Sequence, residues 1–295
     1  MIYQDPLAYL LGLEGVALLD AWAGDHDRAF VEARLAEVRR LLADEQLRDR
    51  GVLAQRVSTV AAYRQQAAGY DAEAGGGLFA VDEPVVAGYL SGRAPGVALD
   101  AACGTGRFAE LLARHGHQVI GTDTSPDMLA RARRRVPDGE FHLAPLDQLP
   151  LPDDSVDVIV CALALVHVPR LHPVLAEFAR VLRPSGDLVI SDIHHELVTR
   201  GSVITARGPA GEPCIAATYR HQLGEYLRAA LSLGLQVRRC EEPASAPPDR
   251  PPPEPAAQIG DWRDWPWSLM AYVPGAARAA GGRPNLVIWH FQRPA

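Results

Sequence analysis

Two glycines and two acids stand near residue 100 with a spacing suited to holding a cofactor. An aliphatic run ends at Asp100 and leads into a turn that contains Gly104 and Gly106. Apolar residues then recur with helical spacing from Phe108 onward, so the pattern predicts a strand, a tight turn and a helix. Glycine permits positive φ and lets backbone N–H groups come close to a ligand at the positive end of a helix. We therefore expect a nucleotide-like cofactor at this turn.

A second acid limits which cofactor this is. The next predicted strand, 118–123, ends at Asp123, and an acid at the end of that strand suits the vicinal hydroxyls of a ribose. Gly104, Gly106 and Ala109 also fit the G-x-G-x-x-A pattern of dinucleotide-binding proteins. Because NAD and S-adenosylmethionine both carry such a ribose, these residues alone leave an NAD(P)-dependent oxidoreductase and a methyltransferase open.

Length, charge and cysteine usage exclude several classes of protein. A chain of 295 residues with 48% hydrophobic residues predicts a large globular core with room for a cap. The net charge of −7 provides no basic excess for phosphates, so no nucleic-acid binding is expected. The apolar stretch 7–19 carries Glu14 and follows no basic segment, which predicts neither a signal peptide nor a membrane span. Four cysteines without C-x-x-C spacing predict free thiols in the cytoplasm.

The elements that position these residues alternate along the chain. Residues 1–90 show helical spacing and predict an N-terminal helical extension or cap, and residues 91–295 predict one Rossmann-like domain. Expected strands are 97–100, 118–123, 139–144, 156–162, 187–193, 235–240 and 286–292, and expected helices are 106–115, 126–135, 172–182 and 221–233. The predicted fold is therefore α/β, with a mostly parallel sheet and helices on both faces.

The last strand distinguishes a seven-stranded sheet from the six strands of a dinucleotide-binding fold. It follows a proline-rich loop at 243–258, which cannot sustain a helix, and a tryptophan-rich segment at 261–274. If 286–292 pairs antiparallel beside 235–240, the sheet has seven strands. Trp262, Trp265 and Trp267 predict either a lid or dimer contact, or simple core packing.

Four motifs in order resemble the class I S-adenosylmethionine-dependent methyltransferases. DAACGTG at 100–106 resembles the family's D-x-G-x-G-x-G loop, and GTDTSPDML at 121–129 resembles its second-strand acid and following helix. The block at 149–168 resembles the L-P-F-x-D-x-S-F-D stretch, and 175–192 resembles the R-V-L-K-P-G-G stretch. The resemblance implies the seven-stranded fold, S-adenosylmethionine as cofactor and methyl transfer to a small molecule.

The resemblance also implies roles for individual residues. The methionine part of the cofactor would lie against Asp100, the glycine turn, the backbone at 161–162 and a tyrosine from 63–70, whereas Asp123 would bind the ribose. Adenine would lie between Met128 and Leu146. The residues assigned to cofactor binding are Tyr63, Tyr70, Asp100, Ala102, Gly104, Gly106, Asp123, Thr124, Met128, Leu146, Asp147, Cys161 and Ala162.

Two departures from the family pattern affect the expected site. Ala102 replaces the first glycine of the loop, which is tolerable if the backbone there does not adopt positive φ. The acid that usually precedes the adenine-edge residue is Pro145 here, and Asp147 is the expected substitute.

The acceptor side is expected beyond the carboxyl ends of the strands. That rule selects His167, His194 and His221 as candidate catalytic residues, with His194 as the first choice for a base. No metal is expected, because adjacent His194 and His195 on a strand would point to opposite faces. The predicted acceptor is a hydrophobic or aromatic natural product, for example an indole, and the predicted assembly is a monomer or homodimer. An NAD(P)-dependent oxidoreductase, or a non-methylating cyclase or binding subunit, is the alternative.

Overall fold

The computed structural model describes residues 1–66, 77–244 and 252–295, which form two compact units. The first unit combines Met1–Val57, Thr199–Ala216 and Ala244–Pro284. The second unit contains the remaining segments, Ser58–Val198, Ala217–Pro243 and Asn285–Ala295. The predicted division at residue 90 coincides with none of the junctions between the units, because residues 58–90 belong to the second unit and two later segments return to the first.

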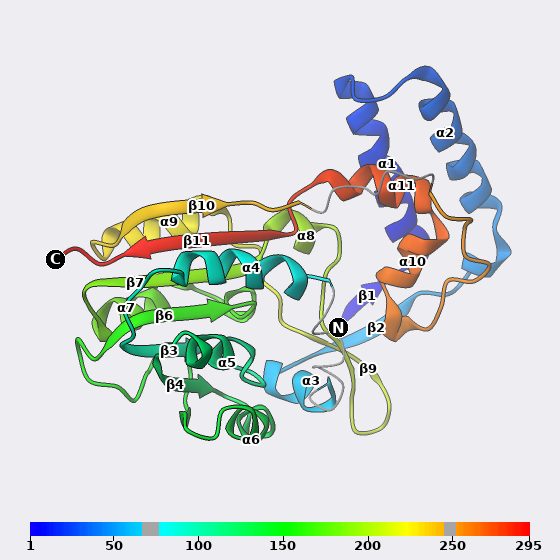
Figure 1. Ribbon diagram of the computed structural model, residues 1–295. Coiled ribbons are helices and arrows are strands. Elements are labelled where there is room, and N and C mark those ends of the chain that lie inside the picture. The colour runs from blue at the N-terminus through cyan, green and yellow to red at the C-terminus, as the bar shows by residue number, and fades with distance from the viewer. Residues whose placement is uncertain (67–76, 245–251) are drawn as a thin grey trace. The chain divides into compact units, whose positions relative to one another are not determined.

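A seven-stranded sheet forms the centre of the second unit (Figure 1). Its order is β10-β11-β7-β6-β3-β4-β5, with β11 antiparallel to both of its neighbours and the other pairs parallel. The strands are β3 (Val97–Ala101), β4 (Gln118–Asp123), β5 (Glu140–Leu143), β6 (Val156–Ala162), β7 (Leu182–Ile193), β10 (Gln236–Glu241) and β11 (Leu286–Gln292). The predicted fold and its seventh strand are confirmed. Because β4 and β6 lie on opposite sides of β3, the strand order reverses there, which is where such sheets bind ligands.

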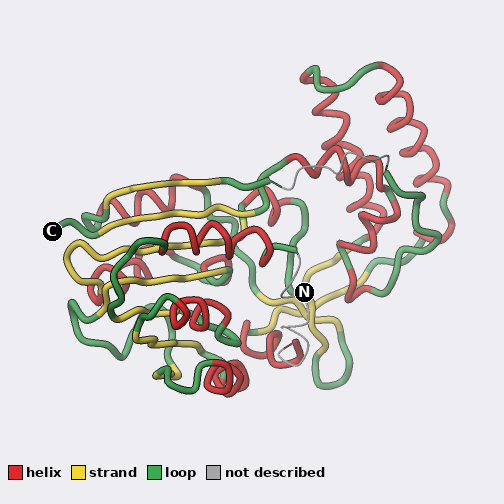
Figure 2. Tube along the Cα trace, viewed as in Figure 1, coloured by secondary structure: helices red, strands yellow, loops and turns green. Residues whose placement is uncertain are grey.

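Helices cover both faces of this sheet (Figures 1 and 2). The described helices of this unit are α3 (Thr59–Gln66), α4 (Phe79–Leu90), α5 (Arg107–Arg114), α6 (Pro126–Arg135), the 3-10 turn η3 (Leu165–His167), α7 (Leu171–Val181), α8 (His195–Thr199) and α9 (Leu223–Ser232). Alternate strand residues point to opposite faces, so Leu99 packs in the core with α7 and α9, whereas Ala98 packs with α4, α5 and α6. The central strands β3, β6 and the second half of β7 are buried on both faces, which explains their nearly continuous apolar sequences.

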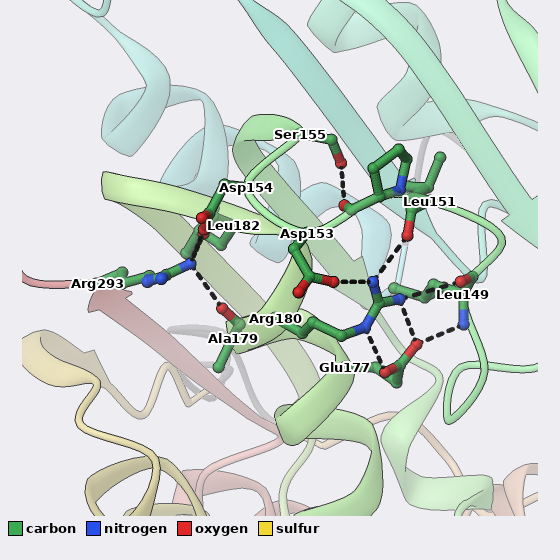
Figure 3. A network of polar contacts seen from close by, with 11 residues as sticks. Leu149, Leu151, Asp153, Asp154, Ser155, Glu177, Ala179, Arg180, Leu182 and Arg293 are labelled. Carbon is green, nitrogen blue, oxygen red and sulfur yellow. Dashed lines mark hydrogen bonds and ion pairs between the residues drawn. The ribbon is translucent and has the colours of Figure 1, made fainter.

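Arg180 of α7 fixes the loop that leads into β6 (Figure 3). Its guanidinium donates to the carbonyl oxygens of Leu149 and Leu151 at 3.1 and 2.8 Å, and to Asp153 at 2.7 Å. Glu177 accepts from two guanidinium nitrogens and from the Leu149 N–H. The proline-containing block at 149–155, which carried part of the family resemblance, is therefore a loop whose backbone groups are bonded to α7.

The described residues of the first unit form a small sheet of their own and four α-helices. The sheet order is β1-β2-β9-β8, formed by segments far apart in the sequence. The elements are β1 (Ile2–Gln4), α1 (Pro6–Ala23), α2 (Arg28–Ala43), η1 (Glu45–Leu47), β2 (Val52–Val57), β8 (Thr205–Arg207), β9 (Pro213–Ala216), η4 (Trp262–Asp264), α10 (Trp267–Tyr272), α11 (Pro274–Ala279) and η5 (Ala280–Gly282). The expectation that residues 1–90 are helical is wrong for β1 and β2, because these short strands are stabilised by pairing with each other and with β9.

Two of the three clustered tryptophans are core residues of the first unit. Trp262 and Trp265 are 6% and 7% exposed and pack with Leu10 and Leu13 of α1. The Trp262 indole donates to the Gln4 side chain at 2.8 Å. The lid interpretation is therefore wrong for these two side chains, because their surface is already covered within their own unit. Trp267 is exposed.

Helix α1 is long and apolar enough, by length and composition, to cross a membrane. In the first unit its Leu10, Leu13 and Ala17 are part of the buried core, which is the usual reason for such composition in a globular protein. The expectation that this stretch does not span a membrane stays a prediction.

A buried ion pair joins α4 to the helix that follows the glycine turn. Arg107, the first residue of α5, donates to both carboxylate oxygens of Asp82 at 2.7 and 2.8 Å. The Asp82 side chain is fully buried, and the Arg107 guanidinium also lies over the Phe79 and Phe108 rings. Because neither charge is easily rehydrated, the pair fixes α4 against the start of α5.

Asp82→Asn is expected to destabilise the second unit by up to about 3–5 kcal/mol, because the largely buried Arg107 guanidinium then keeps only its longer contact with Glu83, at 3.7 Å. Urea denaturation followed by circular dichroism measures this loss. The control is Asp127→Asn, which removes an exposed partner of Arg64 and should cost less than about 1 kcal/mol. Equal losses from the two variants would contradict the role given to the buried pair.

Candidate functional site

A cavity of about 320 Å³ lies at the carboxyl ends of β3, β4 and β6 in the second unit. Loops after these strands and after β5 supply most of its walls, and α3 supplies Thr59, Val60 and Tyr63. The sequence-predicted residues that line it are Tyr63, Ala102, Gly104, Asp123, Thr124, Met128, Leu146, Asp147, Ala162 and His167. The fold thus brings together residues spread over more than a hundred positions of the chain.

The glycine turn has the backbone that its sequence predicts, with one exception. Gly104 and Gly106 have φ of 52° and 88°, in the left-handed region that favours glycine. At Gly106 a Cβ would lie 3.1 Å from the Cα of Ala132, so this glycine also permits the close approach of α5 and α6. Ala102 has φ of 58°. Alanine was expected to be tolerable there only without positive φ, and this condition does not hold. The loop therefore carries backbone strain at this position.

Asp123 is the polar centre of the cavity wall. One carboxylate oxygen accepts from the Gly104 N–H at 2.9 Å and the other from the Ser125 N–H at 2.8 Å. Burial raises the pKa of Asp123, and these backbone N–H groups oppose that shift. The carboxylate is therefore held in one orientation, between the glycine turn and the start of α6, with its edge in the cavity.

Asp100 lies behind the turn. Its side chain is 2% exposed and accepts from the Ala109 N–H of α5 at 2.7 Å. Burial raises the pKa of Asp100 to about 7, with the Ala109 hydrogen bond acting in the opposite direction. Asp100, Gly106 and Cys161 are outside the described lining residues, so in this structure Asp100 supports the turn from within the core.

Apolar side chains and a short polar loop form the rest of the expected cofactor wall. Met128 and Leu146 line the cavity from α6 and from the loop after β5, where Pro145 and Asp147 also line it. Ser125 starts α6 by accepting from the Met128 N–H at 3.3 Å. Tyr70 lies outside the described residues, so its expected role stays a prediction.

Of the three candidate histidines, His167 lines the cavity. Its Nδ1 lies 2.8 Å from the Ala217 carbonyl oxygen, and its Nε2 lies 3.1 Å from the Tyr63 hydroxyl. Burial lowers the pKa of His167, and the contact with Ala217 acts in the opposite direction. The imidazole therefore favours its neutral form.

His194 and His221 use their ring nitrogens in structural contacts. His194 lies 2.8 Å from Glu242 through Nε2, and its Nδ1 accepts from the Glu196 N–H at 3.2 Å. The Nε2–H of His221 donates to the Leu165 and Val168 carbonyl oxygens, which fixes η3. Both residues are outside the described cavity lining. His194, which the sequence suggested as the first choice for a base, is therefore separated from the candidate site.

Sequence reasoning missed several lining residues. Thr59 and Val60 come from α3, and Leu163 lies directly after β6 with φ of 55°. The predicted role of Tyr63 marked α3 as part of the site, but no motif marks Thr59 and Val60, which lie one turn earlier on the same helix. The position of Leu163 just beyond a strand end was a usable signal, because ligands lie there in such sheets.

Comparisons with known proteins agree with this arrangement. Residues 99–190 match the family described as "Methyltransferase domain". Malonyl-[acyl-carrier protein] O-methyltransferase of Yersinia pestis is 38% identical over 97 residues, covering 33% of this chain and 36% of that protein. Methyltransferase GfsG of Streptomyces halstedii is 42% identical over 112 residues, covering 36% and 39%. The chain therefore spans less than half the length of these relatives, and the family resemblance of the sheet region is confirmed.

A solved structure extends the likeness of the fold. The [4+2]-cyclase SpnF matches with a TM-score of 0.53 and 18% identity, over 83% of this chain and 98% of that chain. At this identity the likeness concerns the fold alone.

Ala102→Gly is expected to leave stability unchanged or to raise it by up to about 1 kcal/mol, because relief of the positive φ offsets the entropy cost of glycine. Ala101→Gly is the matched control, since Ala101 is a buried strand residue and its replacement should destabilise. Thermal denaturation compares the two. A loss from Ala102→Gly as large as that from Ala101→Gly would contradict the strain at residue 102.

Asp100→Asn should raise the melting temperature more at about pH 8 than at about pH 5, compared with the unchanged protein. The folded pKa of Asp100, about 7, lies above the unfolded value of about 3.9. Its ionised form therefore destabilises the fold above pH 7, and this effect disappears as the pH falls towards 4. Asp138→Asn, at an exposed position, is the control. The opposite sign of the pH effect would show that ionised Asp100 stabilises the fold.

Proposed function

We propose that this chain, whose sheet region is a class I S-adenosylmethionine-dependent methyltransferase domain, binds S-adenosylmethionine in the described cavity and methylates a small apolar acceptor. The observation that carries the proposal is Asp123, a half-buried carboxylate fixed by two backbone N–H groups at the end of β4. An acid in this place suits the two hydroxyls of an adenosine ribose.

The residues present fit that cofactor. An ionised carboxylate offers about four lone-pair positions, so Asp123 can accept from ribose hydroxyls while keeping its bonds to Gly104 and Ser125. No described atom lies within 4 Å of the place that a Cβ on Gly104 would take, which leaves open space beside the turn. Met128 and Leu146 offer apolar surface for a purine ring.

Methyl transfer needs little from the protein beyond alignment and exclusion of water. When bound, S-adenosylmethionine supplies a methyl group activated by a cationic sulfonium. The chain's own contribution is to orient the ribose through Asp123, to support the turn through Asp100, and to surround the reacting atoms with apolar side chains.

The nature of the acceptor is inferred from the remaining walls. Val60, Leu163, Val168, Pro169 and Val174 line the cavity and offer mostly hydrocarbon surface. Apolar walls with a few convergent polar groups are typical of sites for small hydrophobic molecules. This supports a hydrophobic or aromatic natural product as acceptor, for which an indole remains one candidate.

A non-methylating function is the second candidate. The likeness to the [4+2]-cyclase SpnF favours it, because that protein shares the fold and is named as a cyclase. Incubation with S-adenosylmethionine and a pool of aromatic metabolites separates the two. We expect a product heavier by one CH₂ group together with S-adenosylhomocysteine, whereas a rearranged metabolite of unchanged mass would support the cyclase.

Asp123→Asn is expected to weaken binding of S-adenosylhomocysteine by roughly 10- to 150-fold, since hydrogen bonds to a charged group contribute about 1.5–3 kcal/mol. Isothermal titration calorimetry measures the affinity. The control is Asp127→Asn, an exposed acid in the first turn of α6, which should bind normally. Unchanged affinity in the Asp123 variant, or binding of NAD in place of S-adenosylhomocysteine, would overturn the proposed function.

A further inference from the structure

Two residues from different segments form a polar pair in the wall of the cavity. Tyr63 lies on α3 and His167 ends η3, and both line the cavity. The Tyr63 hydroxyl is 3.1 Å from His167 Nε2, and the two rings meet edge to face at 83° with centroids 5.6 Å apart. The pair therefore has hydrogen-bond geometry and access to whatever occupies the cavity.

The partners of His167 determine where its proton lies. The Ala217 carbonyl oxygen can only accept, so the Nδ1 that lies 2.8 Å from it must carry the hydrogen. In the neutral ring Nε2 then has a lone pair and accepts from the Tyr63 O–H. A tyrosine whose hydroxyl donates to a fixed imidazole nitrogen is arranged to pass on its proton.

We propose that Tyr63 and His167 form a proton relay that takes the proton from an acceptor hydroxyl, and that the acceptor of this enzyme is methylated on that oxygen. This inference rests on the proposed function and names the class of its substrate. Tyr63 is the catalytic residue that meets the acceptor, and His167 acts through it as a positioning residue and final proton acceptor.

The step balances in atoms and charge. The acceptor oxygen forms the new bond to the methyl carbon while the carbon–sulfur bond breaks and leaves its electron pair on sulfur. The acceptor O–H proton moves to the Tyr63 oxygen, and the Tyr63 proton moves to His167 Nε2. One positive charge leaves sulfur as another appears on the imidazole, so the net charge within the cavity does not change. A later exchange with water returns the relay to its starting state.

The surroundings suit a base that is neutral before the step. Burial lowers the pKa of His167, so the ring is neutral before the step. Asp123 and Asp147 line the same cavity. Arg64, beside Tyr63, is paired with Asp127, while His221 and buried Asp192 contact the η3 segment from the other side.

Nitrogen-15 NMR of histidine-labelled protein tests the starting state without any acceptor. We expect His167 to be neutral with its hydrogen on Nδ1, and Tyr63→Phe to shift the Nε2 resonance because it removes the donor. His172 lies at an exposed position on α7. His172→Phe removes the His172 signal and leaves that of His167 unchanged, which helps to assign the two resonances. A hydrogen on Nε2, or an Nε2 resonance that ignores Tyr63→Phe, would overturn the relay.

Kinetics with a panel of phenols, hydroxyindoles and aliphatic alcohols tests the transfer itself. We expect O-methylated products, with kcat lowered roughly 10²-fold or more in Tyr63→Phe while KM changes little. In the unchanged protein kcat should fall at acidic pH, because a protonated His167 cannot accept a further proton. His167→Asn keeps a donor for the Ala217 carbonyl oxygen but has no nitrogen that accepts a proton, so this fall should be absent. His167→Gln is the second variant if the first does not fold.

Binding of S-adenosylhomocysteine separates failure of the relay from failure of the proposed function. We expect His167→Asn to bind it within roughly two- to threefold of the unchanged protein, where a factor of ten corresponds to about 1.4 kcal/mol. Because Tyr63 is also a predicted cofactor contact, the kcat of Tyr63→Phe is measured at saturating S-adenosylmethionine. Normal binding with full kcat in Tyr63→Phe would overturn the relay alone. Loss of binding in the unchanged protein would overturn the methyltransferase proposal as well.

Discussion

The hydrogen bond from the Gly104 N–H to the Asp123 carboxylate is the interaction on which the site depends. It joins the glycine turn after β3 to the end of β4, and the same carboxylate also holds the start of α6 through the Ser125 N–H. Two neighbouring strands of a parallel sheet end at the same edge, so a single acid can organise both loops. Gly104 and Asp123 both line the cavity, so this hydrogen bond fixes the position of two parts of its wall.

Burial then gives the two acids of this edge different properties. Asp100 is fully enclosed and accepts from Ala109, and burial raises its pKa to about 7. Asp123 reaches the cavity and keeps more hydrogen-bond partners, which oppose the effect of burial on its pKa. A carboxylate held by fixed N–H groups needs no rearrangement to accept ribose hydroxyls, which is the advantage of a preorganised site.

Much of the second unit was predictable because its central strands are buried on both faces and read as continuous apolar runs. LVIWHFQ at 286–292 was predicted as the seventh strand, and it lies between β10 and β7. The first unit was not predictable in the same way. Its strands β1, β2, β8 and β9 are short and come from three distant segments, so no local pattern marks their pairing.

At the candidate site the sequence predicted which loops meet but not the partners of each side chain. His167, His194 and His221 all satisfy the rule of strand ends, and only their hydrogen bonds distinguish them. The positive φ of Ala102 was likewise invisible, because alanine gives no sign of the left-handed backbone. Tyr63 was predicted as a cofactor contact, and its pairing with His167 emerges from tertiary structure alone.

A crystal structure of the protein with S-adenosylhomocysteine tests the central claim most directly. We expect both ribose hydroxyls to donate hydrogen bonds to the Asp123 carboxylate, which keeps its bonds to Gly104 and Ser125. The sulfur should face the same cavity as Tyr63 and His167. Ligand density elsewhere, or a ribose bound without Asp123, would contradict it.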